Sequence, residues 1–493
     1  MVACEGRIAR AMKSVQIRHV PMSFDLKSLV AARLGDNYDL HEQHINSTLV
    51  QVQRIIGFDR VYARAEGAYL YDPAGNDYLD FLSGYSVFNT GRNHPVIKQA
   101  VHDALDLDLP NMVQMDCSLL SGLLAEALLK KCPPHLDAVF FCNSGTEAVE
   151  GAIKFARAAT GRSKLVSLHG SYHGLSYGSL SVTDSGNFRA GFGDLLAGVS
   201  HVELGDLAAL ETALMAGDVA AFIIEPVQGK GVHFPTDDFY PQAQALCRKY
   251  GTLFVCDEVQ SGLGRTGKWW AHEHWGLEPD IMTLAKSLSG GYVPCGAIVT
   301  RRSVYQKVFN SLDRCVVHST TFGRNNLAMT CGLATLSVLE NEGLVENAAR
   351  RGDQLMERID ALRAKHPIIK EVRGKGLMIA IEFAEPPSFA GKLAWRAMHK
   401  MDGGLFIQTV VVPMMSKHRI LTLVAGHNMD VIKILPPLII GDREIDRFVD
   451  ALDQTLTAVR QPVGPIWELT ANLLRQKAAA RRADKRRHEL HTA

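Results

Sequence analysis

The chain has 493 residues, 47% hydrophobic and 21% charged, a composition typical of a globular protein with two or three packed units. Its 53 Lys and Arg residues nearly balance its 52 Asp and Glu residues, giving a formal net charge of +1 and no reason to expect a nucleic-acid partner. The nine cysteines include no Cys-x-x-Cys pair, which argues against a zinc site or a disulfide framework. No apolar run is long enough for a membrane span, and the start of the sequence lacks a secretory pattern. We therefore expect the protein to be located in the cytoplasm.

Both ends of the chain are basic. Residues 6–24 contain Arg and Lys without an acid, and residues 473–493 contain seven Arg and Lys against two acids. We interpret these segments as a solvated arm and a frayed helical tail. The alternatives are a transit-like sequence at the start and a weak contact of the tail with an anionic membrane surface.

The middle of the chain alternates short apolar runs with helical stretches. This alternation is typical of βαβ units and predicts an α/β domain whose mostly parallel sheet is covered on both faces. The predicted buried strands are 138–142, 164–168, 220–225, 253–256, 281–284 and 296–300.

The pattern changes near residue 335. Residues 336–365 read as one long charged helix, and a strand-like run follows at 377–383. We therefore predict a smaller C-terminal α+β domain. The expected division is an N-terminal arm and segment (1–66), a large domain (67–335), a small domain (336–462) and a basic tail (463–493).

The first motif with chemical meaning follows the strand at 138–142. Asn143-Ser144-Gly145-Thr146 opens a helix whose apolar residues repeat every 3.6 positions and which ends at Gly161. Free backbone N–H groups and the positive end of the helix dipole suit this turn to binding a phosphate. The simpler interpretation is that Ser144 only caps the helix.

The second motif is the pair of acids Asp257 and Glu258 at the end of the strand 253–256. Open α/β sheets place their ligands at such strand ends. A carboxylate buried there needs a cation or a donor. A protonated pyridine nitrogen satisfies that need, and a magnesium ion is the alternative.

The third motif is Lys286, which follows the strand 281–284 and precedes a loop of small residues. Loss of hydration at such a position lowers the pKa of a lysine and makes its amine a nucleophile. A lysine alone is more often a surface residue with a buried stem. Because the other two motifs are also present, we interpret Lys286 as the nucleophile.

In this order, the three motifs resemble the class III (ω-amino acid type) aminotransferases of pyridoxal-5′-phosphate (PLP) fold type I, over about residues 67–438. The most specific block is DEVQSGLGRTGKWW at 257–270, with Lys286 following it. The resemblance implies a PLP fold type I large domain with a mostly parallel sheet and a smaller α+β C-terminal domain, and it implies PLP as the cofactor with no metal.

The resemblance also implies roles for the residues around the ring. Lys286 would form the Schiff base with PLP and then move the proton between the substrate carbon and the cofactor. Asp257 would hold the pyridine nitrogen protonated, so that the ring can accept electrons. Val259 would pack beneath the ring, and Gln260 would contact its phenolic oxygen.

Further roles follow from the same resemblance. In Ser171-Tyr172-His173-Gly174, Tyr172 would stack on the opposite face of the ring. Glu225 would lie near Asp257 and the substrate. Thr321 would reach the phosphate of a neighbouring subunit, which implies a homodimer or larger assembly. The full cofactor-binding set is Ser144, Gly145, Thr146, Tyr172, His173, Glu225, Asp257, Val259, Gln260, Lys286 and Thr321.

The chain departs from this family at two positions. Ornithine- and 4-aminobutyrate-type members have a glutamate where this chain has Lys230 and an arginine where it has Lys433. Lysine holds a carboxylate without the bidentate fork of arginine. Arg324 also stands where the family usually has a small residue. We therefore expect ornithine and 4-aminobutyrate to be poor donors.

The leading hypothesis is a transaminase that moves an amino group between a terminal amine or aldehyde and an amino acid or 2-oxo acid. A weaker resemblance of residues 418–428 and 465–467 to aminotransferases of hopanoid side-chain synthesis favours a large or lipid-like substrate. The alternatives are a PLP-dependent aminomutase, racemase or decarboxylating transaminase, since the pocket selects which bond breaks. A non-catalytic binding protein would not need Lys286, Asp257 and Gln260.

Overall fold

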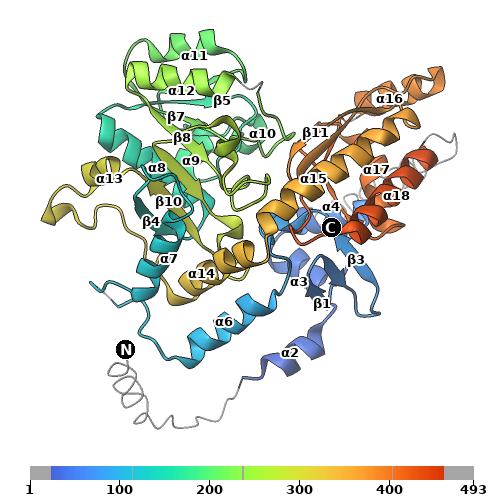
Figure 1. Ribbon diagram of the computed structural model, residues 1–493. Coiled ribbons are helices and arrows are strands. Elements are labelled where there is room, and N and C mark those ends of the chain that lie inside the picture. The colour runs from blue at the N-terminus through green and yellow to red at the C-terminus, as the bar shows by residue number, and fades with distance from the viewer. Residues whose placement is uncertain (1–23, 114, 236–237, 402, 460–493) are drawn as a thin grey trace, which may run out of the picture.

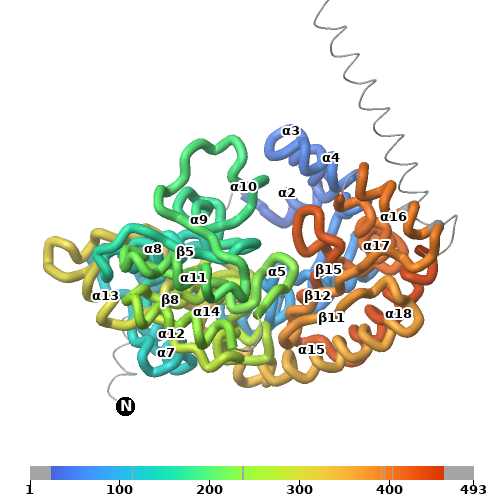
Figure 2. The backbone as a smooth tube through the Cα atoms, turned by 90° about the horizontal axis from the view of Figure 1, so that it is seen from above, coloured from blue at the N-terminus to red at the C-terminus, as the bar shows by residue number. Residues whose placement is uncertain are grey.

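A computed structural model describes residues 24–113, 115–235, 238–401 and 403–459. The basic arm up to residue 23 and the tail from residue 460 lie outside these ranges. The described part forms two lobes (Figure 1), and the view from above shows the same two groups of elements side by side (Figure 2). None of its helices is long and apolar enough to cross a membrane.

The large lobe is built on a seven-stranded sheet with the order β4-β10-β9-β8-β7-β5-β6. Only β10 runs antiparallel to its neighbours β4 and β9, so the predicted mostly parallel sheet is confirmed. The six predicted strands are present to within a residue at each end. Strand β6 was not predicted, because its short sequence is only partly buried and has no apolar run. The bounds are β4 Ala138–Cys142, β5 Lys164–Leu168, β6 Val199–Val202, β7 Val219–Ile224, β8 Leu253–Asp257, β9 Ile281–Leu284 and β10 Gly296–Thr300.

Helices cover both faces of this sheet (Figure 1). On one face Phe222 and Phe254 pack in a cluster with α11 (Leu207–Leu214) and α12 (Phe239–Tyr250). On the other face Ala221 and Val255 pack in a cluster with α8 (Gly145–Thr160) and α13 (Arg302–Val308). Successive strand residues therefore enter opposite cores, which explains why the strands are apolar throughout.

The small lobe contains the four-stranded sheet β11-β12-β15-β14, whose pairs are all antiparallel.

The predicted single helix over 336–365 is wrong. Two helices, α14 and α15, meet at Gly343, whose φ of 61° lies in the left-handed region that ends a helix. The bounds are β11 Ile369–Lys375, β12 Met378–Phe383, β14 Leu423–Val424, β15 Val431–Ile434, α14 Asn326–Asn341, α15 Leu344–Ala361, α16 Phe389–Met401, α17 Leu405–Ser416 and α18 Asp442–Val459.

The N-terminal strands join the C-terminal part of the chain. Strands β1, β2 and β3 form a sheet with β13 (Ile420–Leu421), which pairs parallel to β3. A boundary at residue 67 would pass through this sheet, and the division into domains stays a prediction. The remaining elements are α2 Leu26–Arg33, α3 Asn37–His44, α4 Ser47–Ile56, β1 Arg64–Glu66, β2 Tyr69–Tyr71, β3 Asp77–Asp80, α5 Ser83–Ser86, α6 Pro95–Asp106, α7 Leu119–Leu129, α9 Tyr177–Val182, α10 Gly186–Arg189 and short 3₁₀ turns at Ala271–Trp275, Lys286–Ser289, Leu312–Arg314 and Leu362–Ala364.

Candidate active site

A cavity of about 1360 Å³ lies at the carboxyl ends of β7, β8 and β9, where open α/β sheets bind ligands. Residues of both lobes line it, with the segment 424–429 and Lys433 coming from the small lobe. Ten of the eleven residues predicted for the cofactor line this cavity: Ser144, Gly145, Thr146, Tyr172, His173, Glu225, Asp257, Val259, Gln260 and Lys286.

One wall of the cavity is the start of α8. The hydroxyl of Ser144 caps the helix by accepting a hydrogen bond from the N–H of Glu147 (3.2 Å). The N–H groups of Gly145 and Thr146 have no acceptor within the described ranges of the chain. A Cβ at residue 145 would stand 2.9 Å from Cγ1 of Val259, so only glycine permits this close approach. The helix end is thus capped and still offers two N–H groups to an anion.

The side chain of Thr146 faces a hydroxyl cluster that the sequence did not reveal. Its Oγ1 lies 2.7 Å from Oγ of Ser176 and 2.6 Å from Oγ of Ser179. Glu150, one turn later on α8, accepts hydrogen bonds from Ser176 Oγ (2.6 Å) and from the N–H groups of Gly178 (2.8 Å) and Ser179 (3.0 Å). The hydrogen bonds of this cluster join the start of α8 to the start of α9. The i, i+4 spacing of Thr146 and Glu150 was the one signal for it in the sequence.

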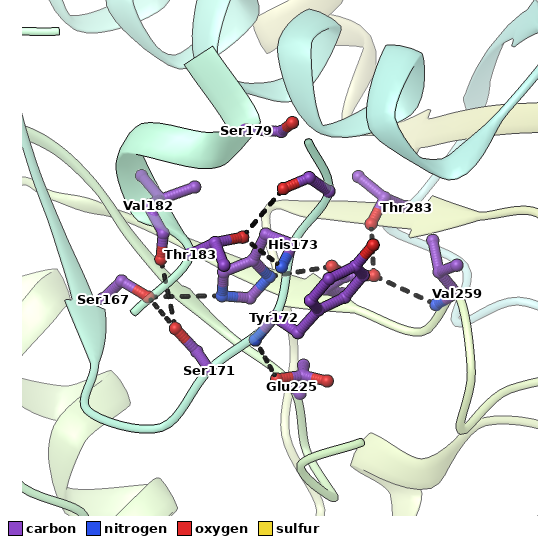
Figure 3. A network of polar contacts seen from close by, with 12 residues as sticks. Ser167, Ser171, Tyr172, His173, Ser179, Val182, Thr183, Glu225, Val259 and Thr283 are labelled. Carbon is purple, nitrogen blue, oxygen red and sulfur yellow. Dashed lines mark hydrogen bonds and ion pairs between the residues drawn. The ribbon is translucent and has the colours of Figure 1, made fainter. Parts of the chain in front are cut away.

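Asp257 ends β8 inside a set of hydrogen-bond donors and is 4% exposed. Its Oδ2 lies 2.8 Å from Nδ1 of His173, and its Oδ1 accepts from the N–H of Val259 (3.1 Å) and the hydroxyl of Thr283 (3.0 Å). Nε2 of His173 contacts Oγ of Ser167 at 3.2 Å (Figure 3). Burial alone would lower the pKa of His173, but the hydrogen bond to Asp257 and the negative charges of Asp257 and Glu225 together outweigh burial and raise it. The arrangement favours an imidazolium that stabilises an anionic Asp257.

The neighbouring acid Glu258 lies outside the cavity that Asp257 lines. Its carboxylate accepts from the N–H groups of Ala271 (3.0 Å) and His272 (2.8 Å), from the hydroxyl of Ser261 (2.7 Å), and contacts Nδ1 of His272 (3.0 Å). It does not line the cavity. The two acids therefore do not converge, and no group of three or more metal-binding side chains occurs among the described residues. The magnesium interpretation has no site in this part of the chain.

Lys286 follows β9 and begins a 3₁₀ turn with a φ of 46°. A positive φ is strained for a residue other than glycine, and such strain concentrates at functional sites. Burial lowers the pKa of its amine, while the negative charges of Asp257 and Glu225 act in the opposite direction. The residue can thus supply a neutral amine inside the cavity.

Glu225 and its neighbours shape the rest of the wall. Its carboxylate accepts from the N–H of Tyr172 (2.9 Å) and the N–H of Gly229 (2.8 Å). Burial raises the pKa of Glu225. The ring of Tyr172 packs edge-on against Phe188 at 5.7 Å. Gln260 donates through Nε2 to the carbonyl of Tyr85 (3.3 Å). Glu225 therefore orients the Tyr172 loop relative to the strand end.

The two lysines that distinguish this chain both line the cavity but contact different groups. Nζ of Lys230 donates to the carbonyl of Asp184 (3.2 Å) and lies 5.5 Å from the ring centre of Phe188. Lys433 is 5% exposed, and its Nζ donates to the carbonyl of Gly229 (2.6 Å) and to Oε1 of Gln260 (3.2 Å). Burial lowers the pKa of Lys433 to about 7, and the charge of Lys286 adds to that effect.

Thr321 is the predicted residue that the single chain does not bring to the cavity. It is exposed and absent from the lining, while the hydroxyl of the preceding Thr320 accepts a hydrogen bond from Nδ2 of Asn143 (2.7 Å). Arg324 is exposed as well. Sequence reasoning missed Tyr85, the segment 184–188 and the segment 424–429 as lining, because these loops meet only in the folded chain.

The cavity fits the expected cofactor. PLP requires donors for a phosphate, an anion for its ring nitrogen and an amine for its aldehyde. The free N–H groups of Gly145 and Thr146, the carboxylate of Asp257 and the amine of Lys286 meet these needs within one cavity. Val259, packed against Gly145, adds an apolar surface to the same cavity.

Comparisons with known proteins show the family to which the chain belongs. The family model "Aminotransferase class-III" matches residues 52–456. The aminotransferase PigE of Serratia sp. (strain ATCC 39006) is 37% identical over 448 residues, covering 84% of this chain. The match covers 52% of PigE, so the chain spans about half the length of that relative.

Solved structures with a similar fold include transaminases. The ornithine aminotransferase of Toxoplasma gondii has a TM-score of 0.74 at 28% identity, covering 86% of this chain and 95% of its own. A second structure of that enzyme (TM-score 0.74, 28% identity, covering 88% and 98%) has PLP at partial occupancy in its active site. A transaminase from the marine bacterium Virgibacillus has a TM-score of 0.77 at 28% identity, covering 87% and 100%. With its family model spanning residues 52–456, the chain belongs to the class-III aminotransferases, a PLP-dependent family of fold type I.

Proposed function

We propose that the protein is a transaminase that moves an amino group between a terminal amine or aldehyde and an amino acid or 2-oxo acid. The observation that carries this proposal is the placement of Lys286, Asp257 and the open N-terminus of α8 around one cavity. When bound, PLP supplies an electron sink for the charge released at the substrate carbon.

The residues of the chain contribute binding, charge and proton transfer. Asp257, whose Oδ2 contacts Nδ1 of His173, would keep the ring nitrogen protonated. Lys286 supplies an amine whose lowered pKa leaves it free to hold and release a proton at Nζ. The N–H groups of Gly145 and Thr146 would bind the phosphate. Tyr172, whose N–H donates to Glu225, would lie over the ring and exclude water.

A large substrate is supported by the size and lining of the cavity. Its volume of about 1360 Å³ exceeds the roughly 300–1,000 Å³ of ordinary ligand sites, so PLP and an extended substrate fit together. Leu175 and Phe188 from the large lobe and Val424, Ala425 and Met429 from the small lobe provide apolar contacts. The last three lie in or beside the segment 418–428, whose resemblance to hopanoid side-chain aminotransferases first suggested a lipid-like substrate.

The exposed position of Thr321 supports a homodimer, because a residue meant for a neighbouring phosphate must face away from its own cavity. Location in the cytoplasm and weak contact of the basic tail with a membrane stay predictions from the sequence. So do the roles of the individual site residues.

The test is a screen of amine donors against pyruvate and 2-oxoglutarate with the purified protein. The donors should include ornithine, 4-aminobutyrate, putrescine, a long-chain amine and a polyol amine. Formation of alanine or glutamate supports transamination. Release of carbon dioxide, migration of the amine within one molecule, or racemisation without a new amino acid would identify one of the alternative reactions.

A further inference from the structure

The side chain of Lys433 extends from the small lobe to the large lobe. Lys433 lies on β15, between Ala380 of β12 and Leu423 of β14. Two residues away on either side, Val431 and Leu435 pack in the apolar cluster that contains residues of α11 and α12. Because alternate residues of a strand face the same side, Lys433 points toward the large lobe as well. Its amine therefore reaches groups of that lobe.

The amine of Lys433 joins two segments of the large lobe. Its Nζ donates to the carbonyl of Gly229 (2.6 Å) and to Oε1 of Gln260 (3.2 Å). The N–H of Gly229 in turn donates to Oε1 of Glu225 (2.8 Å). A Cβ at residue 229 would stand 2.9 Å from Oε1 of Gln260, so a larger residue there would displace the amide. Since Lys433 is 5% exposed, its amine is directed at these two acceptors rather than at solvent.

The two partners of Gln260 determine which end of its amide faces which neighbour. The carbonyl of Tyr85 can only accept, so the amide atom 3.3 Å from it is the nitrogen, Nε2. Oε1 therefore faces Lys433, which donates. An amide nitrogen has two N–H groups, and Tyr85 accepts from only one of them. Within the described ranges the second N–H has no acceptor, and because Gln260 lines the cavity, this N–H is available to a ligand there.

Lys433 gives this amide an orientation that Tyr85 alone would hold weakly. The hydrogen bond to Tyr85 is long, and Tyr85 itself has a positive φ of 61°. Without the amine of Lys433, a half-turn of the amide would place Oε1 toward the cavity, where it would repel an oxygen atom of a ligand. Lys230 does not replace Lys433 in this position, because its Nζ donates to the carbonyl of Asp184 (3.2 Å).

The free N–H of Gln260 suits one group of the cofactor. The site described above already offers partners for the phosphate, the ring nitrogen and the aldehyde of PLP. The remaining polar group of the ring is the phenolic oxygen, which accepts hydrogen bonds and is stabilised in its anionic form by an N–H donor.

We propose that Lys433 is a positioning residue that holds Oε1 of Gln260 away from the cavity, so that an N–H of Nε2 faces the phenolic oxygen of PLP. This inference rests on the proposed transaminase function and adds a residue of the small lobe to its cofactor site. Lys433 acts on the ring only through Gln260, and the peptide of Gly229 keeps the amine in place. Strand β15 thereby influences a cofactor that is held by the large lobe.

The test is a double-mutant cycle of Lys433→Met and Gln260→Ala, with the Kd of PLP measured by equilibrium dialysis of the PLP-loaded proteins. Gln260→Ala should raise the Kd about tenfold and Lys433→Met about fivefold, as expected for one lost and one weakened hydrogen bond. The double variant should match Gln260→Ala at about tenfold, because Lys433 then has no amide to position. Independent effects would multiply to about fiftyfold.

The absorbance of bound PLP gives a second readout. Its pH midpoint should rise in Lys433→Met and in Gln260→Ala, because a phenolic oxygen without its N–H donor holds a proton more tightly. Lys433→Arg keeps a donor for Oε1 and should stay within about twofold of the parent Kd. The matched control is Lys375→Met. Lys375 of β11 also reaches the large lobe, with Nζ 5.3 Å from the ring centre of Phe234, but it does not line the cavity, so Kd and midpoint should not change.

Multiplicative effects in the double variant, or a Lys433→Met protein with the Kd and midpoint of the parent, would overturn the proposal. Should Lys433→Met fail to fold, Lys433→Gln takes its place in the cycle, because a shorter amide that can donate or accept does not fix the orientation of Gln260. None of these measurements needs a substrate. A failed donor screen beside the expected cycle would refute the transaminase and leave the positioning role standing, and a successful screen beside multiplicative effects would do the reverse.

Discussion

Replacing Asp257 with asparagine should preserve the fold and largely abolish turnover. The amide keeps an acceptor for the N–H of Val259 and the hydroxyl of Thr283, but it turns a donor toward Nδ1 of His173 and carries no charge for the ring nitrogen. Two charge-assisted hydrogen bonds of about 1.5–3 kcal/mol each are lost. If both act in the rate-limiting state, the barrier rises by about 3–6 kcal/mol, which lowers kcat by roughly 10²- to 10⁴-fold.

Glu258→Gln provides the matched control, since it removes the same charge from the next residue of the chain. Glu258 contacts Ser261, Ala271 and His272 rather than the cavity, so this variant should lose stability and keep kcat within about threefold. The assay is steady-state kinetics with the best amine donor, together with cofactor absorbance and urea unfolding. The role of Asp257 would be refuted if kcat of Asp257→Asn stayed within threefold of the parent. It would also be refuted if Asp257→Asn and Glu258→Gln, both folded and loaded with cofactor, lost kcat equally.

Four further outcomes are expected. Lys286→Ala should show neither turnover nor a borohydride-fixed PLP adduct by mass spectrometry, and an active alanine variant would exclude the lysine mechanism. Glu150→Ala removes the acceptor of three hydrogen bonds, so urea unfolding should show a loss of about 1–3 kcal/mol and cofactor titration a weaker affinity. Unchanged affinity would separate the cluster from the phosphate site. Sedimentation should show a dimer, and Thr321→Ala should weaken PLP binding, whereas a fully active monomer contradicts the shared site. The pKa of Lys433 should return from about 7 to 10.5 on unfolding, so the unfolded chain binds more protons between pH 7 and pH 10.5. The free energy of unfolding should therefore rise with pH in this range, by at most about 1.4 kcal/mol per pH unit. An equal rise in Lys433→Met would contradict this prediction.

The sequence predicted residues that line the cavity wherever a reactive side chain coincided with the end of a predicted strand. Asp257 and Lys286 follow apolar runs that became β8 and β9, and the carboxyl ends of parallel strands meet at one edge. It could not show that Glu258 turns away, because that depends on His272 fourteen residues later. The bond of Lys433 to Gly229 joins the two lobes and leaves no local pattern. Likewise, one amphipathic pattern ran across Gly343 and hid the break between two helices.

Because strand β10 pairs with both a neighbouring and a distant strand, the formation of the site depends on the order in which the large lobe folds. Its pairing with β9 is a local hairpin that contains Lys286, but its pairing with β4 joins Gly296 to Cys142, far away in the chain. A Cβ at residue 296 would stand 2.6 Å from the carbonyl oxygen of Ser144, so this distant pairing also sets the lysine loop against the start of α8. Contacts between distant segments form slowly, because a long loop must close first. Recovery of cofactor binding during refolding should therefore trail the recovery of secondary structure and mark the completion of the large lobe.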